Sequence, residues 1–230
     1  MNEHLLELCL AGAVFVATHL GLSSTRLRST LAGKLGERGF LAFYSIVAVV
    51  AIVWLVAAYR ASGTTTALWG GDPHLRWAAF ALMPIAFASL VGGFLVRNPT
   101  AVGQESQVGA AGEGAGMLRI TRHPFQWAVV LWALVHIVAN GDLASIVFFG
   151  SLGAVSLAGT FLIDRKKAAR LGAAWLPFAN ATSNVPFAAI VAGRNRLVVG
   201  ELVLPLAIGV ALYALVLLWA HRWIAGAPLI

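Results

Sequence analysis

Apolar positions dominate six long stretches of the chain, and polar or charged residues gather in the segments between them. An α-helix needs about 20 mainly apolar residues to cross the hydrocarbon core of a bilayer, and most of the stretches approach that length. The pattern therefore predicts an all-α fold, a single domain over 1–230 built as a polytopic membrane helix bundle. The predicted transmembrane helices, about six, run approximately over Leu5–Leu22, Phe40–Tyr59, Trp77–Val96, Phe125–Ala139, Ala144–Ile163 and Leu202–Ile224.

The connections between the spans differ in kind. Asn140-Gly141-Asp142 is typical of a tight turn, so the fourth and fifth helices should form a hairpin. Asn98–Gly116 is rich in glycine, which predicts a flexible linker. Asp164–Gly200 starts as a basic helix and continues with aromatic and apolar residues, which predicts a segment that lies at the interface or folds back against the bundle.

Composition supports a membrane protein and excludes several other classes. Hydrophobic residues make up 60% of the chain and charged residues 11%, against about 25% charged residues in ordinary soluble domains. A soluble enzyme, a coiled coil and a disordered regulator are therefore excluded. The one cysteine, Cys9, leaves no disulfide framework and no cysteine-rich metal site.

The net charge is +7, and the basic residues are distributed along the chain as the topology of a membrane protein would place them. All but three of the 16 basic residues lie in the segments after the first, third and fifth spans; the others are Arg60, Arg76 and Arg222. By the positive-inside rule those three segments are cytoplasmic, and both termini lie outside. Because the basic residues form no patch interleaved with aromatic residues, no nucleic-acid partner is expected, and the expected partner is the lipid bilayer.

Two histidines, His19 and His136, lie inside apolar stretches. An ionisable side chain within a membrane is a candidate functional group, although a hydrogen bond to a neighbouring helix would also account for it. Two imidazoles from different helices suit the iron of haem b, held non-covalently because no C-x-x-C-H motif occurs. His19 lies roughly 5 Å and His136 roughly 17 Å from the cytoplasmic face at 1.5 Å per residue, so a His19–His123 pair stays an alternative.

Thr121-Arg122-His123-Pro124 opens the fourth predicted helix. Proline suits the first helical turn, and the motif is accounted for as a helix start at the membrane surface. The free N–H groups of a helix start also favour anions. Arg119, Arg122 and His123 are therefore candidate cofactor-binding residues, the two arginines for a carboxylate or a haem propionate.

Several of these motifs carry a resemblance to a known family. Arg122-His123-Pro124, the segment Leu131–His136, Asn140-Gly141-Asp142 and Ser183–Phe187 together resemble the NnrU family of bacterial membrane proteins. The resemblance implies a multi-pass protein of the bacterial inner membrane associated with nitric oxide and nitrite reduction. It implies a haem b redox or assembly factor of denitrification rather than a catalyst, with a membrane redox protein or a lipid-soluble small molecule as partner.

The same motifs are similar to the 15-cis-ζ-carotene isomerases of plants and cyanobacteria, which are integral membrane haem b proteins. This similarity implies that His19 and His136 are the iron ligands. It also provides the alternative function, a haem-dependent isomerase of a ζ-carotene-like polyene. The isomerases have a cysteine three residues before the second histidine, implicated in a redox-linked ligand exchange, where this chain has Ala133. That departure argues against the same ligand switch but leaves haem binding intact.

A third reading is a membrane methyltransferase that uses S-adenosylmethionine. Such enzymes share an Arg-His-Pro motif at a helix start, followed by a basic helix and an aromatic tail. They usually carry a Glu-Glu pair before the closing helix, where this chain has Asp164-Arg165-Lys166-Lys167. A haem-free structural or partner-binding protein is the fourth reading.

Overall fold

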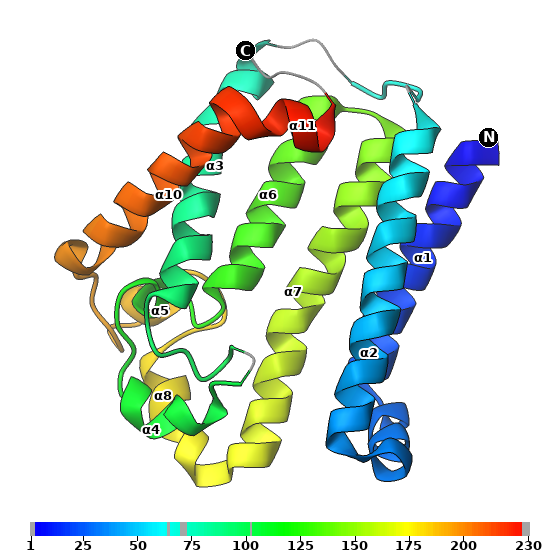
Figure 1. The fold of residues 1–230 in the computed structure, drawn as a ribbon. Coiled ribbons are helices and arrows are strands. Elements are labelled where there is room, and N and C mark those ends of the chain that lie inside the picture. The colour runs from blue at the N-terminus through cyan, green and yellow to red at the C-terminus, as the bar shows by residue number, and fades with distance from the viewer. Residues whose placement is uncertain (1–2, 64, 70–72, 102, 227–230) are drawn as a thin grey trace. The chain divides into compact units, whose positions relative to one another are not determined.

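The structure is a computed structural model that describes residues 3–63, 65–69, 73–101 and 103–226. Within these ranges the chain is helical, with an isolated bridge at Ala67 and Asp142 and no strand, which confirms the all-α prediction. Among the described residues, five helices are long and apolar enough to cross a membrane. The longer helices are α1 (Glu3–Ser24), α2 (Arg26–Ser62), α3 (Pro73–Phe94), α6 (Pro124–Asn140), α7 (Leu143–Leu171) and α10 (Val203–Leu215), coloured from blue to red along the chain in Figure 1.

The predicted fourth span corresponds to α6, which is apolar but has only 17 residues. It is joined to α7 at Gly141, whose φ of 70° is a conformation that glycine adopts without steric cost. The predicted α6–α7 hairpin turn is therefore present. The last span is the least regular, because a π-helical turn over Val216–Ala220 separates α10 from α11 (His221–Ala225).

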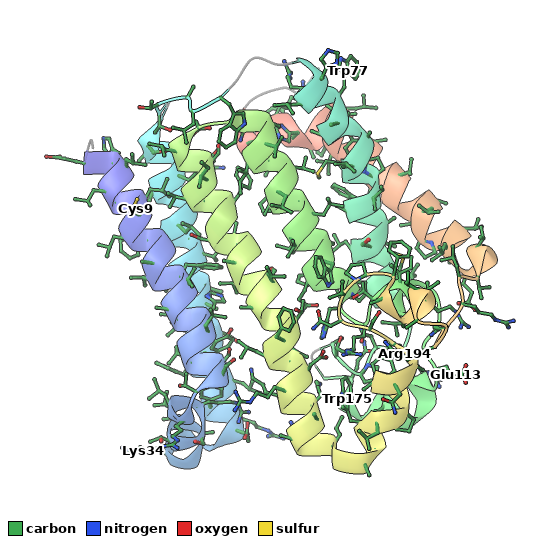
Figure 2. All side chains as sticks on the ribbon, turned by 180° about the vertical axis from the view of Figure 1, so that it is seen from behind. Cys9, Lys34, Trp77, Glu113, Trp175 and Arg194 are labelled. Carbon is green, nitrogen blue, oxygen red and sulfur yellow. The ribbon has the colours of Figure 1, made fainter. Side chains whose placement is uncertain are left out.

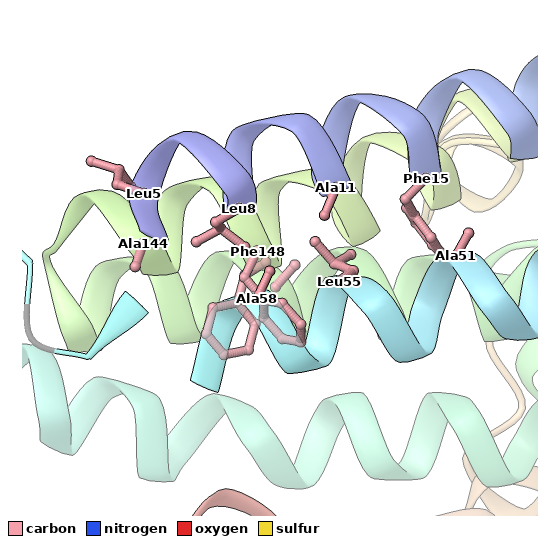
Figure 3. Packing of buried hydrophobic residues seen from close by; sticks show 11 residues of the cluster. Leu5, Leu8, Ala11, Phe15, Ala51, Leu55, Ala58, Ala144 and Phe148 are labelled. Atoms are coloured by element: carbon pink, nitrogen blue, oxygen red, sulfur yellow. The ribbon is translucent and has the colours of Figure 1, made fainter. Parts of the chain in front are cut away.

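The chain divides into two compact units. The first unit comprises residues 1–79 and 132–159, and its core is formed by apolar side chains of α1, α2, α6 and α7. Leu8 and Leu55 are fully buried there, and Phe148 lies beside Ala58 (Figure 3). Burial of these side chains against one another, rather than against lipid, holds the helices of this unit at van der Waals contact.

Two local features shape the α1–α2 connection in the first unit. Thr25 caps α2, since its hydroxyl oxygen accepts a hydrogen bond from the Leu27 N–H at 3.2 Å. Gly36 interrupts α2 with φ 71° and ψ 163°, so the first ten residues of that helix form a separate helical segment. The ion pair of Arg28 with Glu37 spans this break at 2.9 Å.

The second unit comprises residues 80–131 and 160–230. Its membrane helices pack through small residues: a Cβ placed on Gly209 of α10 would lie 2.6 Å from the backbone of Ala88 in α3. Short helices form the rest, namely η1 (Glu105–Gln107), α4 (Val108–Ala111), α5 (Met117–Ile120), η2 (Gly172–Trp175), α8 (Leu176–Ala181), α9 (Ala188–Val191) and η3 (Val199–Leu202).

Both long connections belong to the second unit and both are folded. Asn98–Gly116, predicted as a flexible linker, contains the short helices η1 and α4. At its start Asn98 is buried, and its side-chain oxygen accepts hydrogen bonds from the Thr100 N–H at 3.0 Å and hydroxyl at 2.8 Å. Glycines of that segment with positive φ shape its turns. The basic start of Asp164–Gly200 is the end of α7, and the segment then folds back so that Phe178 packs on Leu118.

Candidate functional site

His19 lies in the last two turns of α1, half-buried in the first unit. Its Nδ1 atom is 2.8 Å from the carbonyl oxygen of Phe15. A carbonyl only accepts, so Nδ1 carries the hydrogen and the neutral ring has its lone pair on Nε2. The ring packs against Phe15, with centroids 4.0 Å apart, and against the edge of Tyr44 at 6.1 Å.

His136 repeats this arrangement on α6. Its Nδ1 atom donates to the carbonyl oxygen of Trp132 at 2.8 Å, which again assigns the lone pair of the neutral ring to Nε2. The ring stacks on Phe149, with centroids 4.6 Å apart and planes 25° apart, and lies 4.9 Å from the ring of Trp132. Each of the two histidines therefore has its own aromatic surroundings.

Each histidine, taken by itself, has the hydrogen bond of a haem ligand. A ligating histidine commonly donates one ring N–H to a backbone carbonyl, which fixes the tautomer and orients the other nitrogen toward the metal. Both His19 and His136 have that tautomer, and their aromatic neighbours suit the apolar surface of a porphyrin. Among the described residues no three His, Cys, Asp or Glu side chains cluster as a metal site, but a haem iron takes only two protein ligands.

Position 133, one turn before His136, is part of the apolar core. Ala133 is 1% exposed, and a Cβ placed on Gly153 of α7 would lie 3.1 Å from its methyl group. The side chain at this position thus faces another helix at close range. It offers no atom that could ligate a metal.

Arg122 and His123 meet on one carboxylate in the second unit. The guanidinium group of Arg122 donates from Nε and from a terminal nitrogen to Asp164, the latter at 2.8 Å, and His123 Nε2 lies 2.8 Å from Asp164 Oδ1. Asn184 donates its amide N–H to Asp164 Oδ2 at 3.1 Å. Arg122 also lies over the ring of Trp175. Figure 2 labels Trp175 among the short helices of this unit.

The ring of His123 is fully buried at the start of α6. Burial lowers its pKa below the ordinary 6.5, the hydrogen bond and charge of Asp164 raise it, and the charges of Arg122 and Lys167 lower it again, with a net fall. The ring is therefore neutral near pH 7, with the hydrogen on Nε2, where Asp164 accepts it. Because Nε2 is used in this way, His123 lacks the tautomer that His19 and His136 present.

Arg119 pairs with a different carboxylate. Its Nε donates to Glu201 at 2.8 Å, one terminal nitrogen donates to the other Glu201 oxygen at 3.0 Å, and the second donates to Asn195 at 2.8 Å. The hydrogen bond to Glu201 raises the pKa of Arg119. The anions that Arg119 and Arg122 bind in the structure are thus carboxylates of the chain itself.

The structure brings together residues that the sequence did not connect. Of the five predicted site residues it joins Arg122 with His123 and gives Arg119 its own partner. Asp164, Asn184 and Glu201 were not singled out as site residues. The signal for Asp164 was its position: it is an acidic residue at the end of an apolar span and directly before a basic run.

These features define a class: an all-helical membrane protein with two histidines hydrogen-bonded within their own helices in one unit and a buried ion-pair cluster in the other. The chain belongs to the NnrU family, whose model matches residues 7–229. It is 30% identical over 212 residues to the chloroplastic 15-cis-ζ-carotene isomerase of Zea mays, covering 85% of this chain and 53% of the relative. It is also 30% identical over 198 residues to the isomerase of Arabidopsis thaliana, covering 80% and 50%. The chain spans about half the length of these curated relatives, and no solved structure matches it.

Proposed function

We propose that the chain is a haem b-dependent cis–trans isomerase of a polyene similar to 15-cis-ζ-carotene, working in the inner membrane of a bacterium. The observation that carries this proposal is the 30% identity, over 85% of the chain, to a relative whose name states that activity. The relatives are chloroplastic by name, so the bacterial membrane is part of the proposal and rests on the resemblance to NnrU proteins.

His19 and His136 are the residues that would hold the cofactor. Each donates its Nδ1 hydrogen to the carbonyl four residues earlier, which fixes the tautomer of the ring. When bound, haem b supplies a redox-active iron centre. The aromatic side chains beside the two histidines present an apolar surface, which suits a substrate that arrives from the bilayer.

The second candidate is a haem redox or assembly factor in nitric oxide and nitrite metabolism. Ala133 favours it, because a ligand exchange needs two alternative ligands and this position supplies no thiolate. Two imidazoles suit both oxidation states of an iron, which favours electron transfer with little rearrangement. Its partner would be a membrane redox protein rather than a polyene.

Haem binding is tested first, by absorption spectra of the purified protein, oxidised and dithionite-reduced. We expect a low-spin b-type spectrum, and a large loss of haem content in His19→Ala and in His136→Ala. His123→Ala is the matched control, because its Nε2 is already bound to Asp164. A haem-supplemented preparation without a Soret band would overturn both candidates. Loss of the band in His123→Ala alone would reassign the ligand.

The two candidates are separated by an isomerisation assay. The gene is expressed in bacterial cells that accumulate 15-cis-ζ-carotene, and the pigments are resolved by chromatography. Conversion that is lost in His136→Ala supports the isomerase. Haem binding without conversion supports the redox or assembly factor, and a gain of conversion in Ala133→Cys would assign the difference to the missing thiolate.

A further inference from the structure

An open groove lies at the end of α3, within the second unit of the chain. Its volume is about 350 Å³, which is in the range of small-ligand sites. Three apolar residues at and just after the end of α3 line one part of it and three polar residues line the other, namely Phe94, Leu95, Val96, Arg97, Gln104 and Gln107. The groove therefore has an apolar part and a polar part.

The polar part presents hydrogen-bond donors. Gln104 Oε1 accepts the N–H of Asn98 at 3.0 Å, which leaves the amide N–H groups of Gln104 to donate. The guanidinium group of Arg97 can only donate. Within the described ranges of the chain, the side chains of Arg97 and Gln107 have no hydrogen-bond or ion-pair partner. Acceptor oxygens with negative charge are the groups that such side chains bind.

Hydrogen bonds hold the polar part to the rest of its unit. Asn98, which binds Gln104, is buried, and its neighbour Thr100 donates its hydroxyl to the carbonyl oxygen of Arg122 at 2.8 Å. The Gln107 N–H donates to the Gln104 carbonyl oxygen at 3.0 Å. Because these contacts already order the backbone, a ligand has less conformational freedom to remove when it binds.

The apolar part faces the surroundings of a membrane helix. Phe94 is 65% exposed and Leu95 is 44% exposed, and the ring of Phe94 lies 6.0 Å from the ring of the exposed Phe125 of α6. Since α3 is long and apolar enough to cross a membrane, its end lies where the hydrocarbon core meets the lipid headgroups. A membrane lipid can therefore place an acyl chain beside Phe94 and a phosphate beside Arg97.

We infer that this groove binds one anionic phospholipid, whose phosphate is held by the three polar side chains and whose acyl chain lies along Phe94 and Leu95. The lining residues that the structure describes include a cation but no carboxylate that could pair with an ammonium group, so a headgroup with net negative charge is preferred to a zwitterionic one. Free phosphate shares the headgroup chemistry but leaves the apolar part unused. The site is independent of the proposed function, since neither His19 nor His136 lines it.

The test is native mass spectrometry of the full chain in detergent micelles, titrated with phosphatidylglycerol and with phosphatidylcholine of the same acyl chains. Both lipids have a phosphate, but phosphatidylglycerol alone has a net negative charge. We expect one phosphatidylglycerol to bind in a saturable way, about fivefold more tightly than phosphatidylcholine. Inorganic phosphate should not displace it at millimolar concentration. Equal binding of the two lipids overturns the inference, and displacement by inorganic phosphate assigns the groove to a free anion instead.

Three variants connect the binding to the groove. Arg97→Gln should raise the Kd for phosphatidylglycerol about fivefold or more, because it removes the charge. Gln107→Leu removes a donor of similar size and should raise the Kd about threefold. Arg196→Gln is the matched control, since Arg196 is an exposed arginine of the same unit outside the groove, and it should change the Kd less than about twofold. Equal effects of Arg97→Gln and Arg196→Gln overturn the inference, because binding then follows the overall surface charge.

Discussion

The two histidines of the first unit and the carboxylate Asp164 of the second unit satisfy their hydrogen bonds in opposite ways. In the unit of residues 1–79 and 132–159, His19 and His136 each bond to a carbonyl four residues earlier in their own helix, and the core around them is apolar. In the unit of residues 80–131 and 160–230, Asp164 collects donors from residues 20 to 42 positions away. The first arrangement is local to one helix, whereas the second depends on several segments being in place together.

Because of this difference, we expect the stability of the two units to depend on different interactions. A histidine bonded within its helix keeps that bond when neighbouring helices shift, so the tautomer of its ring is preserved. A buried carboxylate that pairs with Arg122 and His123 loses its compensation when any one segment moves. We therefore expect the second unit to unfold cooperatively around Asp164, and the first to depend on apolar packing.

The largest expected effect is that of Asp164→Ala. It leaves Nε and one terminal nitrogen of Arg122, together with the donors of His123 and Asn184, without their acceptor, and breaking a buried ion pair costs about 3–5 kcal/mol. The free energy of unfolding in detergent, measured by denaturant titration, should fall by that amount.

Asp142→Ala in the first unit is the matched control for Asp164→Ala. Burial raises the pKa of Asp142, but hydrogen bonds from Ser145, Thr65 and Ala144 outweigh it and lower the pKa overall. All of these donors are uncharged, so the loss should be only about 1–2 kcal/mol. Equal losses in the two variants would mean that charge is not what distinguishes the units.

The packing of the first unit is tested by Leu55→Ala. Leu55 is fully buried in the core between α1, α2 and α7, and truncation of such a side chain costs about 2–5 kcal/mol. We expect a loss near the middle of that range, measured by the same titration. The exposed Val53 of α2 gives the control, because Val53→Ala removes lipid-facing atoms and should change stability by less than about 0.5 kcal/mol.

A smaller effect is expected from adding one methyl group at a glycine in each unit. Gly209→Ala places a Cβ 2.6 Å from the backbone of Ala88, which cannot move away, and should cost about 1–3 kcal/mol. In Gly12→Ala the nearest atom, at 2.7 Å, is the hydroxyl oxygen of Ser151, which can rotate. Thermal unfolding should separate the variants, with Gly209→Ala the less stable. The reverse order would contradict the tight α3–α10 contact.

The smallest effect is a dependence of stability on pH that is confined to the second unit. Burial lowers the pKa of His123 in the folded chain. Just below about pH 6.5 the histidine is therefore protonated in the unfolded chain but still neutral in the folded chain. Stability from this group is complete above pH 6.5 and decreases as the pH falls toward its lower folded-state pKa. The melting temperature should therefore fall between pH 7 and pH 5, and His123→Gln should flatten this change. A variant with the wild-type slope would assign the pH dependence to another group.

The sequence predicted the features that depend on neighbouring residues. Length and hydrophobicity identify a span locally, and Asn140-Gly141-Asp142 identified the α6–α7 turn, since glycine adopts a positive φ there. For Asn98–Gly116 the glycine content predicted a flexible linker, whereas the structure forms η1 and α4 within this segment. Its glycines at positions 103, 112, 114 and 116 have positive φ angles, which shape the turns.

Pairing between distant segments was beyond the sequence. Arg122 and His123 were recognised as candidate residues, but their shared partner Asp164 lies more than 40 positions away and was interpreted only as the start of a basic helix. Glu201 is equally distant from Arg119. A single sequence does not show which residues so far apart along the chain form a pair. The tautomers of His19 and His136, in contrast, follow from a carbonyl one turn away and need only the helix itself.

The break in α2 at Gly36 has a consequence for how this chain tolerates changes in length. In a continuous α-helix, one inserted residue rotates everything on one side of it by about 100° relative to the other side. Such an insertion among residues 26–35 would turn Leu55 and Ala58 away from the core if the helix were unbroken. Because backbone geometry is non-helical at Gly36, the rotation is absorbed there. Insertions and deletions before Gly36 should therefore be accepted, while those between Gly36 and Ser62 should not.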